Sequence, residues 1–126
     1  MASRLKWTAN ILLIVWMVIM TVLLFAPGSP YEGVMFFEGE DKVAHFGLFF
    51  GWSFLMTIRG MYSRYSNTYI YFGVIMIAIL GAVSTEIIQG YIPYRSQDFF
   101  DFLADMIGVP VGILLAILTK RRLISS

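Results

Sequence analysis

The chain lacks cysteine and has few charged side chains. Without thiols it can form no disulfide framework, no zinc–thiolate site and no cysteine nucleophile. It also lacks a G-x-S-x-G motif, which marks one common class of serine nucleophile. Charged residues make up 13% of the chain and give a net charge of +1, too little positive charge for a nucleic-acid-binding surface. We therefore expect no nucleic-acid partner and no thiol chemistry.

Apolar side chains dominate what is present. They make up 59% of the 126 residues, and the mean hydropathy is +0.77, far above that of an ordinary globular domain. Four apolar stretches have about the length that crosses a bilayer, at residues 7–25, 43–58, 69–90 and 99–118. We predict an all-α fold in which residues 1–126 form one domain, an integral-membrane four-transmembrane-helix bundle.

The stretch 7–25 has a second interpretation as a cleaved signal peptide, because basic residues precede it. Its length, and the lack of a clear small-x-small cleavage site after it, favour a retained span. The stretch 43–58 is the weakest of the four, since it contains His45, Gly47 and Gly51.

Basic and acidic residues are segregated along the chain. Seven of the nine basic residues flank the spans on one side, at Arg4, Lys6, Arg59, Arg64 and residues 120–122. All eight acidic residues fall on the other side, in residues 32–41 and 86–105. The positive-inside rule then places both termini in the cytoplasm of a multi-pass protein of the cytoplasmic membrane. Polar chemistry is expected on the outer side.

Three polar groups with helical spacing are expected to meet at that outer end. They are Asp41, Lys42 and His45 in the second span, Glu86 and Gln89 in the third, and Asp98, Asp101 and Asp105 at the last. A carboxylate at membrane depth costs roughly 2.5 to 3.5 kcal/mol, so each must find a partner, water or a proton. Gly108 and Gly112 continue the acidic stripe and predict close packing of the last helix on a neighbour.

Several of these groups allow a structural role as well as a functional one. Glu86 is either the partner of Arg95 in an ion pair or a site residue. His45 can pair with Asp41 or Lys42, or act as an acid, base or metal ligand. Asp98 and Asp101 suit the first turn of a helix, where carboxylates are favoured.

The order of these motifs resembles the VanZ-like family of small membrane proteins. The matching stretches are Asp41-Lys-Val-Ala-His45-Phe46, Glu86-Ile-Ile-Gln89, Pro93-Tyr-Arg95, Asp98 and Asp101-Phe-Leu-Ala-Asp105 with Gly108. They extend over about residues 41–112. Asp105 is a departure, because many relatives have Asn there. The resemblance implies a link to the cell envelope and to resistance against teicoplanin-type glycopeptides.

We therefore expect an outward-facing polar pocket that binds or processes an envelope lipid or a lipid-linked precursor. Catalytic roles fall to His45, Glu86 and Asp101, and substrate-binding roles to Lys42, Gln89 and Arg95. Asp98, Asp101 and Asp105 could hold a divalent metal ion. Two other classes stay open: a non-catalytic accessory protein that binds a lipid, and a proton- or ion-coupled transporter that uses buried acids.

Overall fold

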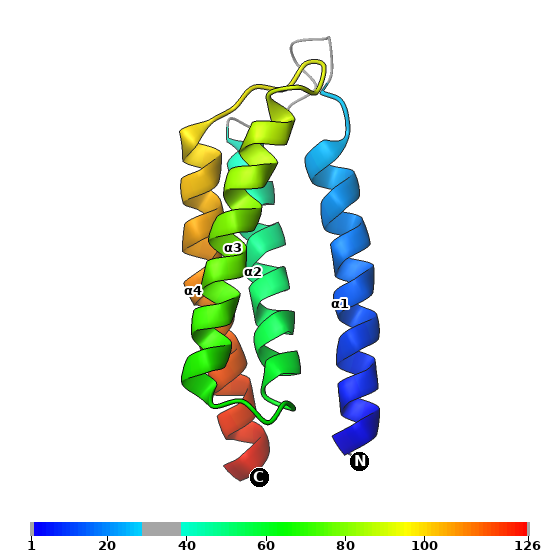
Figure 1. The fold of residues 1–126 in the computed structure, drawn as a ribbon, viewed down its shortest axis with the longest axis vertical. Coiled ribbons are helices and arrows are strands. Elements are labelled where there is room, and N and C mark those ends of the chain that lie inside the picture. Colours follow the sequence, from blue (N-terminus) through cyan, green and yellow to red (C-terminus); the bar gives the residue numbers. More distant parts are fainter. Residues whose placement is uncertain (1, 29–38, 126) are drawn as a thin grey trace.

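The computed structural model describes residues 2–28 and 39–125, and every regular element in these two segments is an α-helix. The helices are α1 (Ala2–Phe25), α2 (Glu40–Gly60), α3 (Asn67–Gln89) and α4 (Phe99–Ser125) (Figure 1). Each coincides closely with one of the predicted stretches, so the all-α prediction is confirmed. Part of the predicted acidic connection, with Glu32 and Glu38, lies outside the described residues.

Three of the four helices, α1, α3 and α4, are long and apolar enough to cross a membrane. Their large apolar side chains are widely exposed, for example Ile14 on α1, Leu80 on α3 and Leu114 on α4. Such continuous exposed apolar surface is expected where side chains face lipid. Helix α2 is not apolar enough to be counted with these three. Its length is sufficient, since its 21 residues extend about 32 Å at 1.5 Å per residue.

Helix α2 is the central element of the bundle, and it contacts each of the other three helices. It buries His45, Leu48, Phe49, Gly51, Trp52, Ser53 and Thr57. Because its neighbours shield much of its surface, α2 needs fewer apolar residues than a helix that faces lipid. This shielding accounts for the weak apolar signal of residues 43–58.

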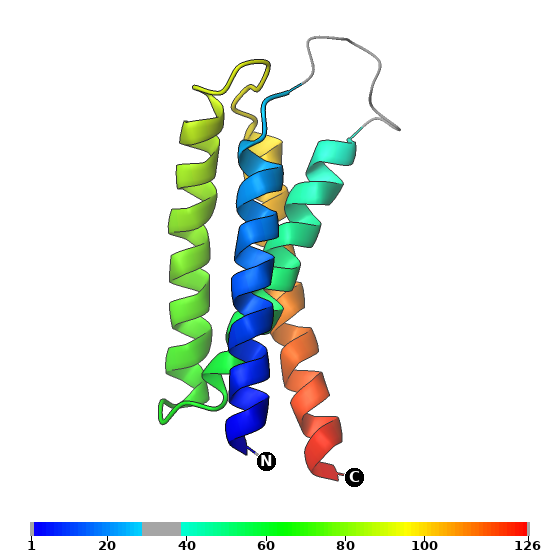
Figure 2. The same cartoon turned by 90° about the vertical axis from the view of Figure 1, so that its right-hand side faces the viewer.

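Both termini lie at one end of the bundle, together with the connection between α2 and α3 (Figures 1 and 2). We call this the basic end, since Arg4, Lys6, Arg59 and Arg64 belong to its segments. The connection between α3 and α4 lies at the opposite end, which we call the acidic end. The predicted segregation of charge thus becomes a separation between the two ends of the bundle.

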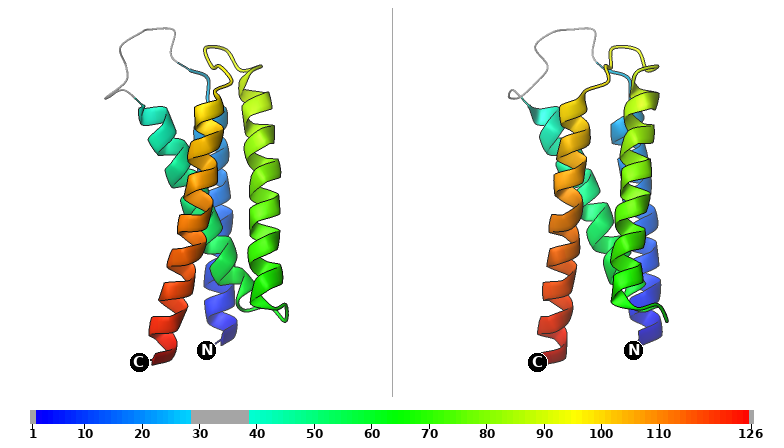
Figure 3. Two further views of the ribbon diagram at one scale, coloured as in Figure 1. Left: turned by 90° about the vertical axis from the view of Figure 1, so that its left-hand side faces the viewer. Right: turned by 60° about the vertical axis from the view of Figure 1, so that its left-hand side comes forward.

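Helices α2 and α4 cross at close range (Figure 3). A Cβ atom placed on Gly108 would lie 2.5 Å from the Phe46 carbonyl oxygen, and one on Gly112 would lie 2.4 Å from that of Phe50. Ser53 Oγ donates a hydrogen bond to the Val109 carbonyl at 3.1 Å across the same contact. The predicted small-residue surface is confirmed, and α2 is the neighbour that it meets.

Helix α1 is attached to α2 by one aromatic side chain. The Trp16 ring packs on Gly51, where a Cβ atom would come within 2.2 Å of the ring. Its Nε1–H donates to the Leu48 carbonyl at 2.9 Å. Near the basic end, Arg59 also donates a hydrogen bond to the Asn10 side chain. These contacts hold α1 against the centre of the bundle.

Candidate functional site

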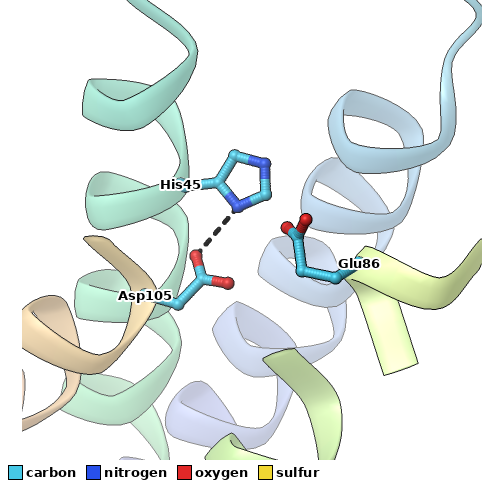
Figure 4. Close-up of side chains that lie close together, drawn as sticks. All are labelled: His45, Glu86 and Asp105. Carbon is cyan, nitrogen blue, oxygen red and sulfur yellow. Dashed lines mark hydrogen bonds and ion pairs between the residues drawn. The ribbon is translucent and has the colours of Figure 1, made fainter. Parts of the chain in front are cut away.

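A buried polar cluster lies at the acidic end, where α2, α3 and α4 converge. It consists of His45 from α2, Glu86 and Gln89 from α3, and Asp101 and Asp105 from α4. His45 and Gln89 are 2% and 1% exposed, Asp101 is 5% exposed, and Asp105 is fully buried. Figure 4 shows His45 with the carboxylates of Glu86 and Asp105 turned toward it. The structure thus brings together all three predicted catalytic residues and two further polar ones.

The His45 ring is held from both of its nitrogen atoms. Nδ1 lies 3.0 Å from Asp105 Oδ1, and Nε2 lies 3.5 Å from the amide nitrogen of Gln89. The Gln89 amide also donates to the Leu24 carbonyl at 2.8 Å, which fixes its NH₂ group toward α1 and His45. An amide NH₂ can only donate, so the contact with Gln89 favours the neutral tautomer whose proton is on Nδ1 and directed at Asp105.

His45 therefore does not take the partners that helical spacing predicted. Asp41 and Lys42 are near in sequence, but their ion pairs are directed to each other and to the start of α4. The imidazole lies one turn deeper, where Asp105 supplies a carboxylate in direct hydrogen-bonding reach. His45 therefore pairs with Asp105 on α4 and not with a residue of its own helix.

Three carboxylate oxygens in the cluster are buried without a hydrogen-bond partner among the described residues: Glu86 Oε1, Asp101 Oδ1 and Asp105 Oδ2. The other Glu86 oxygen, Oε2, accepts from the Asp98 backbone N–H at 2.9 Å. Asp101 Oδ1 does lie 3.3 Å from Lys42 Nζ, an ionic contact without hydrogen-bond geometry. An unsatisfied buried acceptor costs about 1 to 3 kcal/mol, and more if charged, so these oxygens favour binding of a cation, proton or donor group.

A second group of charges closes the cluster toward the end of the bundle. Lys42 Nζ contacts Asp98 at 2.8 Å and both Asp41 and Asp101 at 3.3 Å. The hydrogen bond with Asp98 raises the pKa of Lys42 above its ordinary value, aided by the other two carboxylates and opposed by burial. The same bond, together with the Phe100 backbone N–H, lowers the pKa of Asp98.

Asp98 also shapes the start of α4. Its Oδ1 accepts from the Phe100 backbone N–H at 2.8 Å, and its carbonyl accepts from the Asp101 N–H at 3.0 Å. The predicted capping role of Asp98 is confirmed. Asp101 also falls in the first turn, but its side chain is buried in the cluster.

Arg95 contradicts the predicted ion pair with Glu86. Its Nη2 donates to the Leu23 carbonyl at 3.1 Å and its Nε to the Ala26 carbonyl at 3.3 Å. It forms no salt bridge with a carboxylate in residues 2–28 or 39–125. Tyr94, with φ of 60°, reverses the chain just before Arg95 and directs it to the end of α1. Arg95 thus satisfies carbonyls at a helix C-terminus, where a cation is favoured.

Two sets of side chains in the described segments could each surround a metal ion. In each set one ligand atom per residue lies within 4.8 Å of the others. The first set is His45, Glu86 and Asp105, and the second is Asp41, Asp98 and Asp101. The predicted ligands Asp98, Asp101 and Asp105 are thus divided between two sets. Sequence reasoning treated Asp41 only as a partner for His45, because its spacing to α4 residues cannot be read from the chain.

The structure also has an apolar cavity of about 260 Å³. It lies between α1, α2 and α3 and is lined by Met20, Leu24, Phe49, Trp52, Ala78 and Thr85, among others. Leu24 joins the two sites, since its side chain lines the cavity and its carbonyl accepts from Gln89. Sequence reasoning missed this role of α1, which carries no polar motif.

The chain is similar to known proteins. The chain is 32% identical over 109 residues to the uncharacterized protein C11E3.10 of Schizosaccharomyces pombe, an alignment that covers 86% of this chain and 62% of that protein. The chain therefore aligns with less than two thirds of that relative. No solved structure matches the chain. A model of the VanZ/LLP1 family matches residues 7–120, nearly the whole chain, and the protein belongs to that family.

Proposed function

We propose that the protein is a four-span bundle of the cytoplasmic membrane whose termini face the cytoplasm and whose acidic end faces outward. The basic residues gather at the end that carries both termini, as the positive-inside rule requires for this orientation. Helix α2 completes the fourth span because its three neighbours shield it from lipid. The buried polar cluster then lies within reach of the outer face.

In this membrane the protein binds an envelope lipid or a lipid-linked precursor. The observation that carries this proposal is the link between an apolar cavity and the buried polar cluster: Leu24 lines the cavity, and its carbonyl accepts a hydrogen bond from Gln89 of the cluster. A lipid requires both environments at once, one for its acyl chain and one for its head group. Exposed Met17 and Ile77 border the cavity, so a chain can enter from the bilayer.

The polar groups suit a head group that carries both donors and negative charge. Glu86 Oε1 and Asp101 Oδ1, which have no hydrogen-bond partner among the described residues, accept from hydroxyl or ammonium groups. Lys42, whose side chain is 37% exposed at the rim, is the cation that a phosphate meets first. Arg95 has a positioning role, since it ties the end of α1 to the turn beside the cluster. Teicoplanin resistance, which the family resemblance implies, would then follow from a change in envelope lipids.

Lipid retention tests the proposal most directly. Gly81 lines the cavity, and a Cβ atom there would lie 3.9 Å from Phe49, so a larger side chain enters the cavity without a backbone clash. Gly81→Leu should lose the lipid that native mass spectrometry detects on the wild-type protein. Gly73→Leu, on the same helix with nothing within 4 Å of its Cβ position, is the matched control and should retain it. Equal retention by both variants, or a wild-type protein without a selective lipid, would refute the proposal.

A second candidate function is chemical processing of the bound lipid. It is favoured by the contact between His45 and Asp105 at 3.0 Å, because a histidine held by a carboxylate can act as a general acid or base. A product formed from a lipid-linked substrate should then disappear in both His45→Ala and Glu86→Gln. Retained lipid with no product in the wild-type protein would leave binding as the function and exclude processing.

A further inference from the structure

We propose that His45, Glu86 and Asp105 bind one divalent transition-metal ion of the zinc or manganese type. The three ligands come from three different helices, α2, α3 and α4, and meet inside the buried polar cluster (Figure 4). These residues carry the proposal through their geometry and their unpaired oxygens, independently of lipid binding.

The distances suit ligands of a single ion. Nitrogen and oxygen ligands lie about 2.0 to 2.2 Å from zinc, so neighbouring ligand atoms are roughly 3 to 3.5 Å apart. His45 Nδ1 and Asp105 Oδ1 lie 3.0 Å apart, within this range. All three ligand atoms lie within 4.8 Å of one another, so binding one ion requires that the side chains draw closer together.

The unpaired oxygens are the independent evidence for a cation. Asp105 is fully buried, and its Oδ2 has no hydrogen-bond partner in the described segments; Glu86 Oε1 is likewise buried and unpaired. The donors nearby are already engaged, since Gln89 donates to Leu24 and His45, and Lys42 makes its close contact with Asp98. Two carboxylates and a neutral imidazole carry a charge of about −2, which a divalent ion neutralises.

The donor set selects among metals. Calcium and magnesium favour six or more oxygen ligands, whereas an imidazole nitrogen with two carboxylates suits zinc or manganese. Three protein ligands also leave a coordination position open for water or a head-group oxygen, as in catalytic zinc sites. When Nδ1 binds the ion, the ring proton moves to Nε2, where Asp101 Oδ2, 3.9 Å away, is the nearby acceptor and the contact with the Gln89 amide is given up.

In the second set, Asp41, Asp98 and Asp101, a lysine side chain takes the place that a metal ion would have. The Lys42 ammonium group lies within 3.3 Å of all three carboxylates and neutralises part of their charge. It therefore carries no metal proposal, and it supplies the matched control: Asp41→Asn removes an acidic residue at the same end of the bundle but leaves the three proposed ligands intact.

Metal binding is measured on the full chain in detergent, after treatment with a chelator, by titration calorimetry with Zn²⁺, Mn²⁺ and Ca²⁺. We expect one Zn²⁺ or Mn²⁺ per chain, with weaker Ca²⁺ binding. Glu86→Gln and Asp105→Asn should each weaken Zn²⁺ binding by about 100-fold or more, because each removes a charged ligand. Asp41→Asn should change it by less than about threefold, since it touches no proposed ligand.

A measurement on the wild-type protein keeps the test valid if a variant does not fold. Electron spin-echo spectroscopy of the Mn²⁺-loaded chain should show coupling to one imidazole nitrogen, because His45 is the one histidine in the chain. No saturable Zn²⁺ or Mn²⁺ binding, no nitrogen coupling, or unchanged affinity in a folded Asp105→Asn variant would each overturn the inference. Lipid retention by the metal-free chain is scored separately, so failure of one proposal does not imply failure of the other.

Discussion

A methyl group on Gly112 should force α2 and α4 apart. The added Cβ atom would lie 2.1 Å from Ser53 Oγ, 2.4 Å from the Phe50 carbonyl oxygen and 3.0 Å from the Phe54 backbone nitrogen. The serine side chain can rotate away, but the two backbone atoms belong to α2 itself. Ordinary contact begins near 3.4 Å, so the helices must separate by about 1 Å at this point.

The energetic cost follows from two effects. Overpacking of a tight contact typically costs about 1 to 3 kcal/mol. The separation also weakens the hydrogen bond from Ser53 to the Val109 carbonyl, worth about 0.5 to 1.5 kcal/mol. Alanine regains up to about 1 kcal/mol of helix propensity. We therefore expect Gly112→Ala to lower the free energy of unfolding by about 1 to 3 kcal/mol.

The assay is equilibrium unfolding in detergent, with Gly47→Ala as the control. Gly47 also lies within a helix, α2, but nothing lies within 4 Å of its Cβ position. Its substitution should leave stability unchanged or raise it by up to about 1 kcal/mol. If Gly112→Ala proves as stable as Gly47→Ala, the close crossing of α2 and α4 does not limit stability and this reasoning is wrong.

Three further predictions concern the contacts around the site. Trp16→Phe keeps most of the ring but loses the hydrogen bond to Leu48, so it should lower the free energy of unfolding by about 0.5 to 1.5 kcal/mol; no change in chemical unfolding would contradict this. Arg95→Ala removes the hydrogen bonds to the carbonyls at the end of α1, so it should lower the free energy of unfolding by about 1 kcal/mol. Zn²⁺ affinity should change by less than about threefold, and a much larger loss of Zn²⁺ affinity would instead place Arg95 in the buried polar cluster. The bond between Lys42 and Asp98 should stabilise the fold most between pH 3.8 and 10.5, the ordinary pKa values of the two groups. This stabilisation should be lost as pH falls through the lowered pKa of Asp98, and also as pH rises through the raised pKa of Lys42. Lys42→Met should therefore reduce the pH dependence of the free energy of unfolding in both ranges.

The helices could be predicted because their signals are local. An apolar run of suitable length forms a helix in a membrane wherever its neighbours lie, since its backbone groups must be satisfied within the segment. Positions of residues within one helix follow from the helical repeat, which correctly placed Asp101, Asp105, Gly108 and Gly112 on one stripe. Asp98, predicted on the same stripe, precedes α4 instead. The convergence of His45 with Glu86 was also expected, because both lie near the same end of their spans.

The partners of long polar side chains could not be predicted. Arg95 lies nine residues after Glu86, yet it turns to the carbonyls of α1, because the reversal at Tyr94 sets its direction. Lys42 similarly joins Asp98, 56 residues away, rather than His45. A side chain with several rotatable bonds reaches many candidates, and the fold decides which one is near.

The sequence by itself determined the membrane character, the approximate helix positions and the separation of charge, and it predicted that His45, Glu86 and Asp101 come together. Only the tertiary structure decided that His45 pairs with Asp105, that α1 supplies the wall of an apolar cavity, and that the carboxylates divide into two sets. The physical reason is that composition and helical repeat act along one segment. Distances between segments depend on how closely helices cross, which here is set where Gly108 and Gly112 meet the backbone of α2.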